Sequence, residues 1–211
     1  MRLELEHFTI DGAYGWRQDW FPSWFMRLGG CAAVTACDAC VYFALRFGRR
    51  DLLPVPFDPA QITRQNYLLL SERVKPFLHP RIMGIDRLEI YQDGFGRYLK
   101  NIHASELCID ALRGDADYLK AAAAVRQQIQ TQYPIPFLLL RHQSSEFDNY
   151  EWHWFLLMGY DETPNRFLVQ AVTYGAARWL DFQKLWDTGK QQKGGMILFS
   201  MPEAETTPKA E

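Results

Sequence analysis

The sequence predicts an α+β protein that forms a single domain over residues 1–200. Two observations support this: helix-type patterns dominate the chain up to about residue 130, and short apolar runs separated by turn residues follow them. Such segregation of helices and strands is typical of folds in which a helical half packs on an antiparallel sheet. The length of 211 residues suits one large domain. Residues 201–211 are polar and contain prolines, so we expect a flexible C-terminal tail there.

The helical half begins after a short alternating segment, residues 3–10, which predicts a half-buried strand. The first long helix is expected from Cys31 to about Arg46, with Gly48 as its terminator. Its buried face is predicted from residues at near-helical spacing, which are Val34, Cys37, Val41 and Leu45. A proline-rich loop follows, with Pro54, Pro56 and Pro59.

Residues 62–130 are predicted to be mainly helical, with an interruption at Gly94-Phe95-Gly96. The alanine-rich segment 115–132 has high helix propensity and closes this half. Beyond it, a short helix is expected at 181–188. Strands are expected at 135–140, 151–160, 166–173, 176–180 and 195–200.

Composition narrows the classes of function. Hydrophobic residues make up 48% of the chain and aromatic residues 15%, enough for a packed core. The net charge of -2 and the absence of a long basic block give no electrostatic reason to expect nucleic-acid binding. The charged N-terminal segment is unlike a signal peptide, and no stretch is long and apolar enough to predict a membrane span. Four cysteines in such a chain predict free thiols and a cytoplasmic location.

The strongest chemical signal is a cysteine at a predicted helix start and a histidine in a distant apolar strand. Cys31 follows Gly29-Gly30 directly, where the helix dipole favours the thiolate form. His153 interrupts an aromatic and aliphatic run, where a titratable side chain is costly unless it has a partner. The two residues are candidates for a nucleophile and its base. A small core cysteine and a hydrogen-bonded core histidine are the alternative interpretation.

Two segments resemble the papain-like cysteine peptidases, in particular the bacterial branch similar to the bacteriocin-leader (double-glycine) peptidases. Gly30-Cys31-Ala32-Ala33-Val34-Thr35-Ala36 is similar to the segment that opens the family's central helix, with Ala32 in place of the usual glycine. His153-Trp154-Phe155-Leu156-Leu157-Met158-Gly159-Tyr160 is similar to the family's histidine strand, with one extra apolar residue. The order of the later strands also resembles the family, so the resemblance covers most of the chain.

The resemblance implies a papain-like fold and thiol acyl transfer on a peptide-like amide, with Cys31 as nucleophile, His153 as base and the Cys31 N–H as an oxyanion donor. It implies no metal and no organic cofactor, and it leaves the oligomeric state open.

Two positions depart from the family pattern. The family's orienting Asn or Asp after the histidine is absent, which leaves Gln170 or Thr173 to orient the ring. Phe25 occupies the position of the family's oxyanion glutamine, and Gln18 is the nearest upstream glutamine, either a substitute for it or a surface side chain.

Two other classes of function stay open. The chain is alternatively a non-catalytic binding module that keeps the fold and has lost the orienting residue. A redox or zinc protein using Cys37 and Cys40 is the third possibility, although a structural zinc site needs two further ligands and the sequence offers none at similar spacing. Cys108 is predicted to be a core residue.

Overall fold

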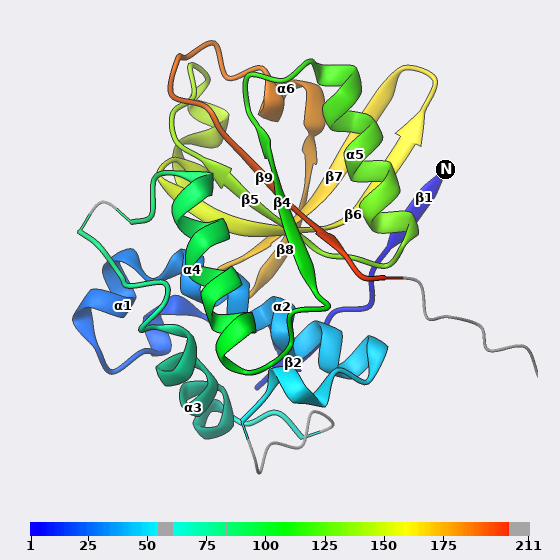
Figure 1. The fold of residues 1–211 in the computed structure, drawn as a ribbon. Helices are drawn as coiled ribbons and strands as arrows, with labels where there is room; N and C mark the ends of the chain where they lie inside the picture. Colours follow the sequence, from blue (N-terminus) through cyan, green and yellow to red (C-terminus); the bar gives the residue numbers. More distant parts are fainter. Residues whose placement is uncertain (55–60, 83, 203–211) are drawn as a thin grey trace, which may run out of the picture.

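A computed structural model describes residues 1–54, 61–82 and 84–202. The expected α+β architecture is confirmed in this part of the chain: helices pack against a sheet whose strand pairs are antiparallel (Figure 1). The expected tail beyond residue 202 and the loop containing Pro56 and Pro59 lie outside the described residues.

The main sheet joins seven strands of the described residues. They are β1 (Arg2–Glu4), β4 (Cys108–Arg113), β5 (Ile135–Leu139), β6 (His153–Thr163), β7 (Arg166–Thr173), β8 (Ala176–Asp181) and β9 (Gly194–Ser200). Their spatial order is β4-β9-β5-β6-β7-β8, and β1 pairs with the distal part of β6, where Leu3 lies opposite Tyr160. β2 (Thr9–Ile10) and β3 (Ala13–Tyr14) form a separate small hairpin. The four C-terminal strands β6 to β9 lie close to their predicted positions.

The helices form two groups, whose apolar residues build two buried clusters. The first cluster draws on α1 (Trp24–Gly29), α2 (Cys31–Phe47), α3 (Arg64–Val74) and α4 (Leu88–Asn101). The second draws on α5 (Tyr118–Gln130) and α6 (Phe182–Trp186). Short 3-10 helices lie at Gln18–Trp20, Arg50–Leu52 and Ser145–Tyr150.

Alternation along the strands separates these clusters. The cross-strand pair Leu138 and Trp154 belongs to the first cluster, and the neighbouring pair Phe137 and Phe155 to the second. The sheet is therefore covered on both faces. In the described parts of the chain, none of the helices has the length and apolar character needed to span a membrane.

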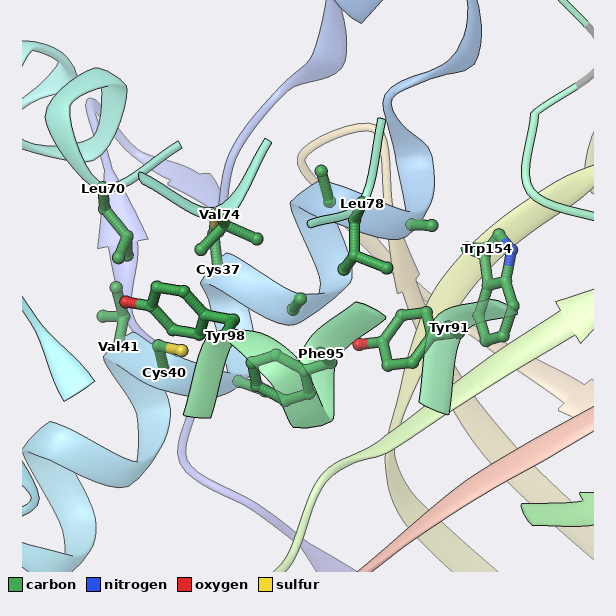
Figure 2. Packing of buried hydrophobic residues seen from close by; sticks show 14 of the residues in the cluster. Cys37, Cys40, Val41, Leu70, Val74, Leu78, Tyr91, Phe95, Tyr98 and Trp154 are labelled. Carbon is green, nitrogen blue, oxygen red and sulfur yellow. The ribbon is translucent and has the colours of Figure 1, made fainter. Parts of the chain in front are cut away.

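The helix that starts at Cys31 is the most deeply buried of the helices in the described residues. Figure 2 shows Cys37, Cys40 and Val41 of α2 among side chains of α3 and α4. The sequence predicted one buried face, but α2 is buried on almost every side, and the expected face residues Val34 and Leu45 are only partly buried. The small side chains of this helix permit the close approach of its neighbours. Gly48 ends the helix in a left-handed conformation, with φ of 66°, as predicted.

Three local expectations for residues 62–130 are wrong. Residues 108–113 form β4 rather than a helix, because Ile109, Ala111 and their neighbours pair with β9. Cys108 is exposed at the start of this edge strand, not in the core. The helix α4 runs through Gly94 without interruption. Glycine is needed there for packing, because the chain at Phe77 lies so close that a Cβ would be 2.4 Å from the Phe77 carbonyl oxygen.

This close approach makes Gly94 a packing requirement. We expect Gly94→Ala to lower the free energy of unfolding by about 2 kcal/mol, because the added methyl displaces the Phe77 backbone. Gly96→Ala is the matched control, since a Cβ there meets only Ile109 Cδ1 at 3.7 Å and alanine has the higher helix propensity, worth about 0.5–1 kcal/mol. Urea unfolding of both variants measures the difference; equal stabilities would contradict the packing at Gly94.

Candidate active site

Cys31 is the first residue of α2, and two glycines fix its place. Gly29 ends α1 and Gly30 precedes α2 directly. A Cβ at Gly29 would lie 1.8 Å from the Arg81 carbonyl oxygen, and one at Gly30 would lie 2.5 Å from the Met26 carbonyl oxygen. Only glycine therefore permits this tight junction between the two helices, and the thiol is held, 4% exposed, at the N-terminus of a buried helix.

His153 is the first residue of β6 and is also buried. The preceding Trp152 has a φ of 53°, an uncommon conformation for a large side chain. Its N–H donates to the Leu140 carbonyl at 3.2 Å, and Arg141 lies over its ring. Strained backbone of this kind persists where the surrounding structure holds it, which here fixes the entry into the histidine strand.

The structure places Cys31 and His153 in the wall of one cavity. This cavity measures about 500 Å³ and lies between the N-terminus of α2 and the start of β6. The other side chains that border it include Gln18, Arg27, Leu28, Glu151, Trp152 and Tyr174. Two residues that are 122 positions apart in the sequence thus border one cavity.

Thr173 is the hydrogen-bond partner of the histidine. The distance from His153 Nε2 to Thr173 Oγ1 is 2.6 Å, so the structure joins the ring to Thr173 rather than to the thiol. Thr173 ends β7, and its register places it on the same face as His153, because Val172 lies opposite Leu156. Of the two residues considered for orienting the ring, Thr173 is the one that is hydrogen-bonded to it.

Tyr174 was not found by sequence reasoning. Its ring is stacked on the His153 ring, with centroids 4.6 Å apart and planes within 4° of parallel. Tyr174 and Gly175 both have positive φ, 51° and 76°, as in the two-residue type I′ turns that join β-hairpins. The available signal was the dipeptide Tyr174-Gly175 between two alternating strands, which predicts the turn but not the stacking.

Gln170 does not lie at the site, and this expectation is corrected. It is three residues from Thr173 on the same strand, and an odd separation places two side chains on opposite faces. Its amide donates to Glu4 Oε2 at 2.7 Å, so Gln170 links β7 to the N-terminal strand.

Gln18 borders the cavity, but its amide is turned to α1. The side-chain nitrogen donates to the carbonyls of Met26 at 3.1 Å and Arg27 at 3.0 Å. Both amide hydrogens therefore have partners, and a role toward an oxyanion requires this group to reorient. Phe25, which stands at the position of the family's glutamine, is exposed on α1.

Burial decides the charge of the thiol. The sequence predicted a pKa lowered by the helix dipole, but desolvation raises the pKa of Cys31 above its usual value. The backbone N–H groups of Trp154, Ala32 and Cys31 act in the opposite direction and do not overcome it. The resting group is a neutral thiol at neutral pH.

Burial also keeps the histidine neutral. It lowers the pKa of His153 to about 4, so the imidazole carries no charge at neutral pH. A neutral ring has one nitrogen free to accept a proton, as a general base requires. When Nε2 carries the hydrogen and donates it to Thr173, Nδ1 is the accepting nitrogen. Cys31 and His153 are thus both neutral and do not form a thiolate–imidazolium ion pair at neutral pH.

The structure gives no support to the redox or zinc interpretation. Cys37 and Cys40 of α2 are buried in the first hydrophobic cluster (Figure 2), and burial raises the pKa of both thiols. Within residues 1–54, 61–82 and 84–202, no group of three or more His, Cys, Asp or Glu side chains is arranged to hold a metal ion.

No protein-family model matches the chain, and no curated protein matches it in sequence.

The lowered pKa of His153 predicts a pH-dependent stability. The unfolded state binds a proton near pH 6.5 and the folded state only near pH 4, so the unfolded state holds more protons in this window. The contribution of neutral His153 to the free energy of unfolding is fully present above pH 6.5. It decreases as the pH falls toward 4, by up to about 3 kcal/mol. We expect the free energy of unfolding of His153→Gln to fall by about 3 kcal/mol less than that of the wild type between pH 6.5 and 4.

Urea unfolding at several pH values between 7 and 4 tests this prediction. His7, whose pKa burial also lowers to about 4, contributes a second decrease of the same sign, and His7→Gln is the matched variant. An unchanged pH dependence in His153→Gln would contradict a neutral buried His153.

Proposed function

We propose that the protein is a cysteine-dependent acyl hydrolase or transferase with a papain-like fold that acts on a peptide-like amide. The observation that carries the proposal is the shared cavity of about 500 Å³ with Cys31 and His153 in its wall. The arrangement of the elements supports it: a buried helix that begins at the cysteine packs on an antiparallel sheet, one strand of which begins at the histidine.

In this reaction, Cys31 Sγ attacks the carbonyl carbon of the substrate while His153 Nδ1 takes the thiol proton. The carbonyl electrons move to oxygen, and the N–H of Cys31 at the start of the helix stabilises the charge. When the tetrahedral intermediate collapses, the C–N bond breaks and His153 returns the proton to the leaving amine. Water, or an acceptor amine, then attacks the thioester with His153 as base and releases Cys31.

Thr173 orients His153 in this proposal, in the place where the family has Asn or Asp. Its hydroxyl accepts the Nε2 hydrogen and keeps Nδ1 available to the thiol. A hydroxyl stabilises an imidazolium less than a carboxylate does, so we expect a slower enzyme than one with an aspartate.

A non-catalytic binding module in the same fold is the second candidate. Two observations favour it: burial raises the pKa of the Cys31 thiol, and both amide hydrogens of Gln18 are bonded to α1. A cavity of this size can bind a peptide segment without chemistry.

Acylation by p-nitrophenyl acetate separates the two candidates. An acyl-transfer enzyme releases p-nitrophenolate in a burst, and peptide mass spectrometry finds the acetyl group on Cys31. We expect His153→Ala to lower the rate at Cys31 by about 10²–10⁴-fold, the usual contribution of a general base. Exposed Cys108 is the internal control, since its rate should not change.

The binding module predicts a different outcome. Cys31 would then react no faster than Cys108, and His153→Ala would leave both rates unaltered. That result would contradict the enzymatic proposal.

A further inference from the structure

A second, small cavity lies behind the histidine, between α2 and the β6–β7 pair. It measures about 20 Å³, and its walls include His153, Thr173, Thr35 and Asp38. A space of about 10–15 Å³ is enough for one water molecule when polar partners surround it. A buried carboxylate of α2 and the Thr173 hydroxyl thus border one cavity that has room for a single water.

Asp38 lies two helical turns after Cys31 and is buried. The Tyr67 hydroxyl donates to its Oδ1 at 2.6 Å, and the backbone N–H of Trp16 is a further donor. These bonds lower the pKa of the carboxyl group, but burial outweighs them and raises it to about 7. The proposed reaction leaves this costly buried group without a role.

The chain segment before α1 packs against Asp38 and bonds to the turn after Thr173. Gly15 of this segment packs against the carboxylate so tightly that a Cβ there would lie 2.5 Å from Asp38 Oδ2. The adjacent Tyr14 N–H donates to the Gly175 carbonyl at 3.0 Å, in the turn that directly follows Thr173. One short segment thus contacts both Asp38 and the turn that follows Thr173, the hydrogen-bond partner of His153.

The Thr173 hydroxyl can bond to the ring in either of two directions. If it donates to Nε2, the ring proton lies on Nδ1 and the ring cannot accept the proton of Cys31. If it accepts from Nε2, its own hydrogen needs an acceptor elsewhere. An acceptor on the far side of Thr173 therefore decides whether His153 can act as a base.

We propose that Asp38 is a positioning residue that accepts the Thr173 hydrogen through one water molecule in the small cavity, and so holds His153 in the tautomer that can deprotonate Cys31. This inference rests on the proposed acyl-transfer function. It assigns the family's missing carboxylate to a different element, the nucleophile helix itself. No bond to carbon is made or broken at Asp38.

The other ionisable groups near this chain of contacts do not offer the same acceptor. Tyr67, Cys37 and Cys40 lie near Asp38, and burial raises the pKa of each, so they are neutral. Tyr14 borders the small cavity, and Tyr174 borders both cavities with a pKa that burial raises to about 12. The other ionisable residues near His153 border the larger cavity, on the Cys31 side: Arg17, Asp19, Arg27, Cys31 and Glu151.

The test is the pH dependence of Cys31 acetylation by p-nitrophenyl acetate, read at each cysteine by mass spectrometry. We expect Asp38→Asn, which preserves shape, to lower the Cys31 rate about tenfold, a coupling in the range found for contacting residues. The wild-type rate should increase with pH through an inflection near 7 as Asp38 ionises, and this inflection should be missing in Asp38→Asn. A loss of packing alone would lower the rate without removing the inflection.

Thr173→Val provides a second, independent arm. The proposal predicts that Asp38→Asn has no further effect when Thr173 is already valine, and that Thr173→Val by itself removes the inflection near pH 7. Thr173→Ser keeps the hydroxyl and should keep the inflection. Tyr67→Phe leaves the carboxylate in place and removes a hydrogen bond that lowers the Asp38 pKa, so the inflection should persist and move to higher pH.

Two results would overturn the inference. One is that Asp38→Asn and Thr173→Val, combined in one protein, lower the Cys31 acetylation rate by the product of their separate effects. The other is an inflection near pH 7 that survives in either single variant. If Asp38→Asn fails to fold, the Thr173 variants decide alone. Failure of the proposed function looks different: Cys31 of the wild-type protein would then show no fast acetylation and no dependence on His153.

Discussion

The burial of α2 determines the rest of the molecule. This helix contacts α3 and β6, and its alanines and cysteines allow those elements to approach closely. Because the helix cannot shift within such packing, its first residue is fixed against the start of β6. The same burial has an electrostatic cost, since it removes water from the Cys31 thiol and from the His153 ring. The packing therefore fixes the positions of Cys31 and His153 and keeps both side chains uncharged at neutral pH.

A neutral pair changes what the surrounding hydrogen bonds must provide. An ion pair is held by attraction, whereas a neutral thiol and a neutral imidazole depend on the direction of each hydrogen bond. The type I′ turn after β7 supplies two contacts at once, the Thr173 hydroxyl on Nε2 and the Tyr174 ring on the face of the imidazole. The orientation of His153 is thus set by a hairpin turn rather than by an acidic side chain in the following strand.

The sequence was sufficient for the parts of the fold that follow local patterns. The helix from Cys31, its end at Gly48 and the C-terminal strands all carry periodicity or turn residues that act locally. It failed where distant chain segments decide the outcome. Residues 108–113 become a strand because β9 pairs with them, and Gly94 is tolerated inside α4 because Phe77 packs on it. The same limit applied at the site: Thr173 was one of two candidates, and only the strand register, through Val172 and Leu156, separates it from Gln170.

The sheet order has a consequence for the synthesis of the chain. β9, the last strand of the described residues, lies between β4 and β5 and pairs with both. Until residues 194–200 have left the ribosome, β4 has no neighbour in the sheet and β5 lacks one of its two partners. Of the strands in the described residues, β9 is thus synthesised last, and one edge of β5 stays unpaired while β6 to β8 are already available to pair. Loss of residues 194–200 would separate β4 from the sheet and leave an edge of β5 unpaired, and such exposed strand edges are the sites where nascent chains associate wrongly.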